Sequence, residues 1–293
     1  MHIIDGKKIA QEVLERLKLQ KKPEKFFAAI LVGNDLASLN FLKQKERIAH
    51  ELGIDFRLYT LDPQITTDAL RREIARLAGP KQCGACIVQL PLPLHINRHY
   101  ALNAIPREKD PDLLSEAALG AFYTGRNPVV PPSVATIEEI LKRHEVNLRE
   151  LKVVLVGAGF LIGKPAGFWL QNRVAELTVL DRHVHDIRAH LRDADVVISG
   201  VGHGNLFSAD DIKDGAIVID FGWNKVDGKI TGDFDPVAVG HGLQASSHKS
   251  SVISHESRGI SYTPTPGGTG PILVAKLFEN FYILTRTRLE NSF

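Results

Sequence analysis

Apolar residues in the first half of the chain alternate between helical spacing and short continuous runs typical of buried strands. Within residues 7–19, helical spacing is shared by Ile9, Val13, Leu14 and Leu17. The run 26–33, Phe-Phe-Ala-Ala-Ile-Leu-Val-Gly, is short and ends in glycine, so it predicts a buried strand. The same alternation predicts further strands at 56–61 and 85–89 and helices at 37–52 and 67–78. Helices that connect apolar strands indicate right-handed crossovers and a parallel sheet.

The proline-rich stretch 128–132 cannot continue a helix, and the alternating pattern restarts after it. A helix is expected at about 134–144, and strands are expected at 151–157, 176–180, 196–199 and 216–221. This second half has the pattern of a doubly wound unit, which places a lobe boundary near residues 120–130. Residues 238–258 show no periodicity and predict a loop, whereas 270–287 predict a closing helix that packs back on the first lobe.

Composition and charge narrow the class of protein. The 293 residues suit two lobes, and 44% hydrophobic with 24% charged residues is an ordinary globular composition. A formal charge of +2 gives no support for nucleic acid or an anionic membrane as the main partner. No apolar run approaches the ~20 residues that cross a bilayer, and the first residues lack a signal-peptide pattern.

Two cysteines, Cys83 and Cys86, have the Cys-x-x-Cys spacing of a redox pair or half a zinc site. No second pair exists to complete a zinc site, and both residues lead into the apolar run Ile87-Val88. They are therefore interpreted as core residues, and no metal site is predicted. So few cysteines favour a reducing cytoplasm as the location.

A glycine-rich turn follows the strand predicted at 151–157. Gly157, Gly159 and Gly163 have the spacing Gly-x-Gly-x-x-x-Gly, one residue longer than the usual dinucleotide fingerprint, and a predicted helix follows. Asp181 ends the next strand, where an acid can accept from both hydroxyls of an adenosine ribose; its alternative is a local cap. A carboxylate there repels a 2′-phosphate and favours NAD, but Arg182 can pair with that phosphate and reverse the preference.

Several longer runs carry a more specific signal. They are Ile3 to Lys7, Ser38 to Lys45, Val88 to Pro93, Lys109 to Asp112, Gly163-Lys164-Pro165 and Thr263 to Pro271. In these runs, and in their order, the sequence resembles the methylenetetrahydrofolate dehydrogenase/cyclohydrolase family nearly from end to end. The resemblance implies oxidation of 5,10-methylenetetrahydrofolate with NAD(P)⁺ and hydrolysis of the methenyl product to 10-formyltetrahydrofolate. It also implies tetrahydrofolate substrates and a homodimer, and the family usually takes NADP.

The expected fold is α/β with two lobes, an N-terminal α/β substrate lobe and a Rossmann-like dinucleotide-binding lobe. Residues 1–125 with 265–293 are assigned to the first lobe, and residues 126–264 to the second.

The resemblance also implies roles for single residues. Lys45 is the catalytic lysine, which needs a pKa lowered from ~10.4 by burial so that it is neutral near pH 7. Gln89 is its neutral amide partner, and Asp112 pairs with the polar edge of the pterin. Each has a simpler alternative: a solvated lysine, a loop-capping amide and a turn acid. The turn with Gly267, Gly268 and Pro271 binds substrate or nicotinamide by close backbone approach, or is a plain linker.

The sequence departs from the family pattern at a few of these positions. Phe41 stands where the family usually has Tyr, so it can stack on the substrate but offers no hydroxyl. Ala158 and Gly159 replace an Arg-Ser pair that binds the 2′-phosphate of NADP, which again favours NAD. Leu113 replaces the usual Gly after the second Asp.

Two other functions fit parts of the pattern. A two-lobe dehydrogenase for a hydroxy acid such as shikimate also lines its cleft with Lys and Asp, but it does not account for Val88 to Pro93 or Thr263 to Pro271. A catalytically weak folate- or dinucleotide-binding relative fits the departures at Phe41 and Leu113, whereas the intact Lys45 and Gln89 favour an enzyme.

Overall fold

The computed structural model describes residues 1–226, 228–237 and 259–290, so the loop predicted at 238–258 lies outside the described residues. The chain forms two compact units. Unit 1 contains Met1–Ile9 and Thr136–Ile272, and unit 2 contains Ala10–Ala135 and Leu273–Phe293. The expected lobes follow a different division: Met1–Ile9 and 265–272, expected in the first lobe, lie in unit 1, and 126–135, expected in the second lobe, lie in unit 2.

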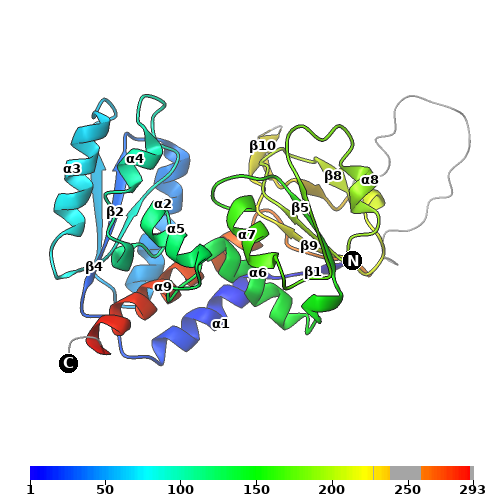
Figure 1. Ribbon diagram of the computed structural model, residues 1–293, viewed down its shortest axis with the longest axis horizontal. Coiled ribbons are helices and arrows are strands. Elements are labelled where there is room, and N and C mark those ends of the chain that lie inside the picture. The colour runs from blue at the N-terminus through cyan, green and yellow to red at the C-terminus, as the bar shows by residue number, and fades with distance from the viewer. Residues whose placement is uncertain (227, 238–258, 291–293) are drawn as a thin grey trace, which may run out of the picture. The chain divides into compact units, whose positions relative to one another are not determined.

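Unit 2 is built on a three-stranded parallel sheet in the order β3–β2–β4 (Figure 1). The strands are β2 (Phe26–Val32), β3 (Phe56–Leu61) and β4 (Cys83–Val88), and the crossover helices are α2 (Leu36–Glu51) and α3 (Thr67–Ala78). Every residue of β2 and β4 is buried, as their unbroken apolar runs predict. Cys83 and Cys86 are buried free thiols of β4, which confirms their interpretation as core residues.

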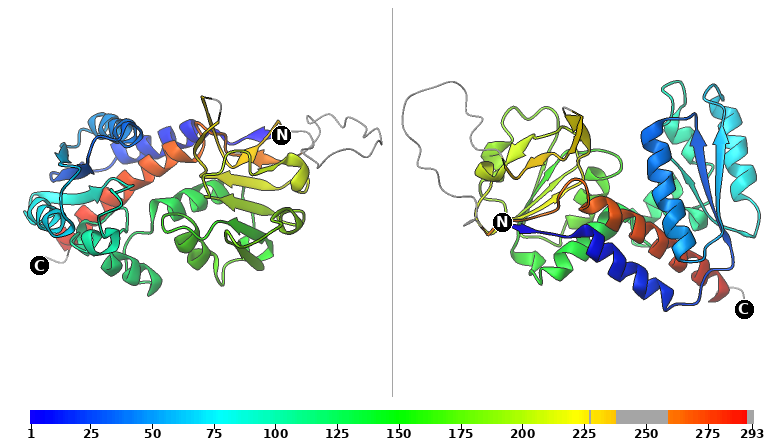
Figure 2. Two further views of the ribbon diagram at one scale, coloured as in Figure 1. Left: turned by 90° about the horizontal axis from the view of Figure 1, so that it is seen from above. Right: turned by 180° about the vertical axis from the view of Figure 1, so that it is seen from behind.

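Helices at both ends of the chain cover this sheet. α1 (Gly6–Lys18) and α9 (Thr269–Glu290) lie side by side in both views of Figure 2. Val13, Leu14 and Leu17 of α1 and Phe278 and Phe281 of α9 share one core with β2. Within it, the ring of Phe27 lies 5.3 Å from each of the rings of Phe278 and Phe281. The prediction that the closing helix packs on the first lobe is confirmed.

Short elements complete unit 2 after β4. They are α4 (Arg98–Leu102), the 3₁₀ turn η1 (Arg107–Lys109) and α5 (Glu116–Tyr123). Ser115 is the N-cap of α5, and its side chain accepts from the backbone N–H of Ala118.

Unit 1 contains a six-stranded parallel sheet in the order β1–β13–β9–β7–β5–β6. Its strands are β1 (His2–Ile3), β5 (Lys152–Val156), β6 (Glu176–Leu180), β7 (Val196–Ser199), β9 (Ile217–Asp220) and β13 (Ser261–Tyr262). The first residues extend this sheet because β1 pairs with β13.

The remaining elements of the second half are short. The helices are α6 (Pro132–Arg143), α7 (Gly163–Leu170) and α8 (Arg188–Leu191), with 3₁₀ turns η2 (Leu148–Glu150) and η3 (Ala209–Asp211). The strands β8 (Phe207–Ser208) and β12 (Phe234–Asp235) pair in parallel, and β10 (Asn224–Val226) pairs with β11 (Lys229–Thr231) as a hairpin. No described helix is long and apolar enough to cross a membrane.

The contact between β4 and α9 predicts a difference between two glycines of unit 2. A Cβ at Gly84 would lie 2.8 Å from both Lys25 Cβ and Phe281 Cε2, whereas a Cβ at Gly120 in α5 meets nothing within 4 Å. Gly84→Ala is expected to lower the free energy of unfolding by about 1–3 kcal/mol through overpacking. Gly120→Ala is expected to raise it by about 0.5–1 kcal/mol through helix propensity. Urea denaturation of both variants measures the difference, and an equal effect would contradict the described packing.

Candidate active site

Lys45 lies on the buried face of α2. This helix begins at the N-cap Asp35, whose side chain accepts from the backbone N–H of Ser38. Its buried residues recur at helical spacing as Ser38, Leu42, Lys45 and Ala49. Lys45 thus occupies a core position on the helix, and it is only 5% exposed. The solvated alternative for this lysine is wrong.

Gln89 meets the amine of Lys45 at the end of β4. Lys45 Nζ donates to Gln89 Oε1 at 3.1 Å, and Gln89 Nε2 donates to the carbonyl of Leu90 at 2.7 Å. Because the carbonyl of Leu90 takes the amide NH₂, the amide oxygen is turned toward the lysine. Burial lowers the pKa of Lys45, and this amide supplies no charge to oppose that shift.

Asp112 is the third predicted residue of this site and lies near Lys45. Burial raises the pKa of Asp112, and the charge of Lys45 acts in the opposite direction. Burial likewise lowers the pKa of Lys45, and the charge of Asp112 opposes it. The structure therefore brings Lys45, Gln89 and Asp112 together, with burial favouring the neutral forms of both the amine and the acid.

Two residues that the sequence did not single out hold the turn that carries Asp112. Lys109 is 3% exposed, and its Nζ donates to the carbonyls of Ala78, Gly79 and Pro80 at the end of α3. The carboxylate of Asp110 accepts from the backbone N–H groups of Leu114 and Ser115 at 3.1 and 2.8 Å. Burial raises the pKa of Asp110 to about 6. The sequence motif Lys-Asp-x-Asp at 109–112 contains both residues, but only its last residue, Asp112, was assigned a role from the sequence.

The turn also shows why the family usually has glycine after Asp112. Leu113 has a φ of 52°, the left-handed region that glycine adopts without steric cost. The Leu113 side chain is 2% exposed, so apolar burial offsets part of that cost here.

Phe41 lies one helical turn before Lys45, and its ring centroid is 4.8 Å from Lys45 Nζ. The half-buried ring also packs against the core of unit 2. Phe41 therefore borders the lysine, and its ring is a flat apolar surface with no hydroxyl beside the amine. Its stacking on the substrate stays a prediction.

Unit 1 carries the predicted dinucleotide residues. Gly157 directly follows β5 with a φ of 99°, and Gly163 begins α7. A Cβ at Gly163 would lie 1.8 Å from the carbonyl oxygen of Gly157, so only glycine fits there. A Cβ at Gly159 meets nothing within 4 Å, so the protein itself does not require glycine at that position. The loop thus brings backbone groups to the start of a helix.

Asp181 lies beside this loop. Val156 and Leu180 are paired in the ladder of β5 and β6, and the N–H of Gly157 donates to the carbonyl of Leu180 at 2.8 Å. Asp181 is exposed, and its Oδ1 accepts from the backbone N–H of His183 at 2.8 Å. Arg182 is also exposed. Asp181 therefore forms the local cap that was one of its two predicted roles. Its other carboxylate oxygen, Oδ2, takes no part in that hydrogen bond.

The turn before α9 forms around Gly267 and Gly268. Gly267 has a φ of 102°, and a Cβ at Gly268 would lie 2.5 Å from the carbonyl oxygen of Pro264. Gly6 approaches so closely that its Cβ would lie 1.7 Å from the carbonyl oxygen of Gly268. Pro271 stands in the first turn of α9, where its missing N–H costs no hydrogen bond. These residues form a packed turn of unit 1 and not a linker.

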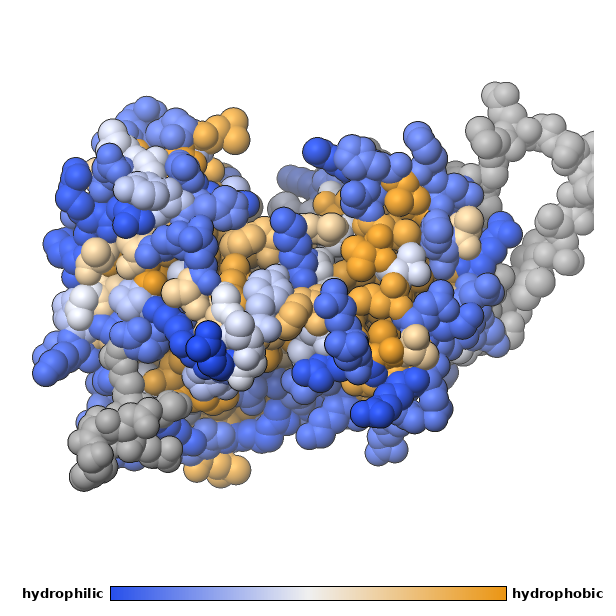
Figure 3. All heavy atoms as spheres, viewed as in Figure 1, coloured by the Kyte–Doolittle hydropathy of each residue, from blue (hydrophilic) through white to orange (hydrophobic). Residues whose placement is uncertain are grey.

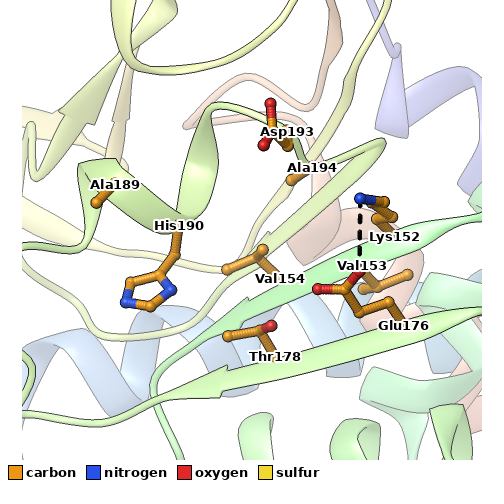
Figure 4. Close-up of a pocket in the computed structure, with 9 residues that line it drawn as sticks. All are labelled: Lys152, Val153, Val154, Glu176, Thr178, Ala189, His190, Asp193 and Ala194. Carbon is orange, nitrogen blue, oxygen red and sulfur yellow. Dashed lines mark ion pairs between the residues drawn. The ribbon is translucent and has the colours of Figure 1, made fainter.

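A shallow pocket of unit 1 contains none of the predicted residues. It has a volume of about 150 Å³ and lies between α8 and the strands β5 and β6 (Figure 4). Its charged groups include Lys152 and Glu176, which form an ion pair at 3.6 Å across the first residues of the two strands. This is the amino edge of the sheet, opposite the glycine loop. Among the described residues, no group of three or more His, Cys, Asp or Glu is placed to hold a metal ion.

Two family models match the chain. The catalytic domain of tetrahydrofolate dehydrogenase/cyclohydrolase matches residues 4–112, and the NAD(P)-binding domain of the same family matches residues 131–289. The chain belongs to the tetrahydrofolate dehydrogenase/cyclohydrolase family. Membership of this family confirms the resemblance and decides against the hydroxy-acid dehydrogenase.

Relatives in the tetrahydrofolate dehydrogenase/cyclohydrolase family match over nearly the whole chain. The bifunctional protein FolD of Bacillus licheniformis is 36% identical over 95% of both chains. The crystal structure of FolD from Campylobacter jejuni is 31% identical and has a TM-score of 0.87, covering 98% of this chain and 99% of that one. The Trypanosoma brucei enzyme, solved with NADP and an inhibitor, is 28% identical with a TM-score of 0.84 and 98% coverage of both chains.

The contact between Lys45 and Gln89 predicts a shift in the pH–rate profile of hydrolysis. In Gln89→Glu, a carboxylate replaces the amide beside the amine, stabilises its charged form and raises the pKa of Lys45. A smaller fraction of Lys45 is then neutral at each pH, so the ascending limb of the profile moves to higher pH. Gln44→Glu, which adds the same charge at an exposed position of α2, is the matched control. An unmoved limb in Gln89→Glu, or an equal movement in Gln44→Glu, would show that the two side chains are not coupled.

Proposed function

We propose that Lys45, Gln89 and Asp112 carry out the two reactions of this family in this chain. The reactions are the oxidation of 5,10-methylenetetrahydrofolate with a nicotinamide dinucleotide and the hydrolysis of 5,10-methenyltetrahydrofolate to 10-formyltetrahydrofolate. The observation that carries the proposal is the buried amine of Lys45, held by the neutral amide of Gln89 at 3.1 Å. An amine with a lowered pKa can act as a base near neutral pH.

In hydrolysis, neutral Lys45 accepts a proton as water adds its oxygen to the methenyl carbon. The same group then returns a proton to N5 of the folate as the bond between that carbon and N5 breaks. The hydroxyl of the adduct loses its proton to solvent as the carbonyl forms, which leaves the formyl group on N10. Gln89 orients the amine without adding charge, so Lys45 gains and loses the proton with little bias toward the charged form.

The neighbouring side chains are proposed to position the folate. The half-buried carboxyl of Asp112 binds the polar edge of the pterin, and Phe41 supplies an aromatic face for the flat rings. In unit 1, the turn of Gly267 and Gly268 is proposed to bind substrate or nicotinamide through its backbone, which carries no side chains there.

Lys45→Met tests the base directly. Removing the amine while keeping an apolar side chain of similar length in the buried site is expected to lower the hydrolysis rate by about a hundredfold or more. Hydrolysis of methenyltetrahydrofolate above the spontaneous rate is the measurement, with circular dichroism to establish folding. Lys43→Met, at an exposed position of the same helix, is the matched control and is expected to keep the wild-type rate. A folded Lys45→Met variant with wild-type hydrolysis would also identify the chain as a relative that does not use this lysine.

The dinucleotide is proposed to bind at the glycine loop, and NAD is proposed as the preferred form. Gly157 and Gly163 bring the loop backbone to the start of α7, where N–H groups can face a pyrophosphate. When bound there, the dinucleotide would supply the acceptor for the hydride of the methylene carbon. Asp181 directly follows the neighbouring strand β6, level with Gly157, and is proposed to accept hydrogen bonds from the ribose hydroxyls. A 2′-phosphate at that position would meet the same carboxylate.

Asp181→Ser is expected to move cofactor preference toward NADP. Charge repulsion and lost ribose hydrogen bonds should cost NADP about 2–3 kcal/mol, roughly thirty- to hundredfold in affinity. The measurement is kcat/KM for NAD and NADP in the wild type and the variant. Asp186→Ser is the matched control, because exposed Asp186 also caps a backbone N–H, that of Arg188, at 3.0 Å. A wild-type preference for NADP, or a Ser variant that gains nothing with NADP, would contradict the assignment and point to Arg182.

A homodimer is proposed as well, with the edge strand β6 as part of the contact. β6 is the edge strand of the six-stranded sheet, and its fourth residue, Val179, is 46% exposed. Figure 3 shows apolar side chains at the surface of the part of unit 1 that carries β5, β6 and α7. Val179→Glu is expected to yield monomers in sedimentation analysis, where the wild type sediments as a dimer; a monomeric wild type would contradict the proposal.

The proposed location is the reducing cytoplasm. Its support is the pair of buried free thiols at Cys83 and Cys86.

A further inference from the structure

Two buried carboxylates of unit 1 take no part in the reactions proposed above. Asp220 is the last residue of β9 and is 1% exposed, and Asp233, just before β12, is fully buried. Both lie at the carboxyl ends of the parallel strands, the edge of the sheet that carries the glycine loop. A buried carboxylate is costly unless it accepts hydrogen bonds, so the groups that each one binds show what it holds in place.

Asp233 holds the segment 199–203, which consists of the last residue of β7 and the four residues after it. Its Oδ2 accepts from Ser199 Oγ at 2.5 Å and from the backbone N–H of Val201 at 2.8 Å. Its Oδ1 accepts from the backbone N–H of His203 at 2.8 Å. One side chain thus binds three donors within five consecutive residues, and only an acceptor with two free oxygens can do so.

The segment that Asp233 holds packs directly against the glycine loop. A Cβ at Gly157 would lie 3.1 Å from Val201 Cγ2 and 3.5 Å from the backbone of Gly200. A Cβ at Gly200 would lie 2.9 Å from Ile162 Cγ2, and Ile162 is the residue immediately before α7. Groups packed at these distances leave no free space between them. A displacement of 199–203 would therefore also shift Gly157 and Ile162, at the two ends of the glycine loop.

Asp220 connects the same network to the turn before α9. Its side chain accepts from the backbone N–H of Gly222 at 2.6 Å and of Phe234 at 3.0 Å. Its own backbone N–H donates to Thr263 Oγ1 at 2.7 Å, and its carbonyl accepts from Thr269 Oγ1 at 2.8 Å. Thr263 and Thr269 bracket the turn that contains Gly267 and Gly268.

Neighbouring glycines make room for the two carboxylates. A Cβ at Gly222 would lie 2.2 Å from Asp233 Oδ1, and a Cβ at Gly232 would lie 2.0 Å from Asp220 Oδ2. The charge of Asp233 contributes to raising the pKa of Asp220, which burial brings to about 7. The fold thus keeps two acids close together despite the cost of burying both.

We propose that Asp233 is a positioning residue for the dinucleotide, which through the segment 199–203 fixes the glycine loop in the conformation that binds the cofactor. Asp220 extends the same hydrogen-bond network to the turn of Gly267 and Gly268. The inference rests on the proposed binding of the dinucleotide at the glycine loop.

Asp233→Asn tests the proposal, because the amide keeps the shape of the acid but presents an NH₂ group to a backbone N–H donor. The unpaired donor is expected to displace 199–203 and to raise the dissociation constant and the KM of the dinucleotide about tenfold. The KM for methenyltetrahydrofolate in the hydrolysis assay, which needs no dinucleotide turnover, is expected to change less than twofold. A residue that serves stability alone would leave the affinity of the folded variant for the dinucleotide unchanged.

Asp195→Asn is the matched control. Asp195 also accepts from a backbone N–H, that of Lys152 at 2.7 Å, but it lies at the amino edge of the sheet. Its replacement is expected to lower stability and to leave dinucleotide affinity within twofold of the wild type. Ser199→Ala, which removes one of the three donors to Asp233, is the second variant in case Asp233→Asn does not fold, and it is expected to raise the dissociation constant severalfold.

Gly163→Ala separates the failure of this inference from the failure of the proposed cofactor site. Its Cβ would collide with Gly157, so it disrupts the glycine loop itself. If Gly163→Ala weakens dinucleotide binding and folded Asp233→Asn or Ser199→Ala does not, the positioning role is wrong and the cofactor site stands. If none of the three variants weakens binding, both are wrong.

Discussion

The chemistry proposed for unit 2 depends on one buried hydrogen bond, from the amine of Lys45 to the amide oxygen of Gln89. At a core position of α2, the ammonium form of Lys45 is destabilised because its charge is removed from water. This destabilisation lowers the pKa and so favours the neutral amine. A carboxylate partner would favour the ammonium and cancel the effect, whereas an amide orients the amine and adds no charge. The remaining parts of the site can be understood from this requirement.

Three parts of unit 2 hold Lys45, Gln89 and Asp112 in position. The buried face of α2 places Lys45 inward, and the end of β4 places Gln89 opposite it. The turn that brings Asp112 near the amine is held by Lys109, which binds carbonyls at the end of α3, and by Asp110, which binds the backbone after the turn. These contacts involve rigid elements or buried polar groups, so the geometry exists before substrate binds, as the proposed proton transfer requires.

The sequence predicted most of the larger elements and the residues around Lys45. Long apolar runs such as β2 and β4 have a clear pattern, because both of their faces are buried. The two-residue strands β1 and β13 have no detectable period, so the assignment of the first nine residues to unit 1 could not be foreseen. Lys109, Asp110, Asp220 and Asp233 were also missed, since a buried polar residue that binds distant backbone groups looks like any turn acid or surface lysine in sequence.

The most direct test of this account is the ionisation of Lys45 in the folded chain. Carbon-13 NMR of the lysine Cε atoms follows each amine through a pH titration, and Lys45→Met assigns the signal. The account predicts that Lys45 loses its proton at a lower pH than exposed lysines such as Lys43, because burial lowers its pKa. A Lys45 signal that titrates together with the exposed lysines would contradict the claim that a buried, neutral amine carries the chemistry.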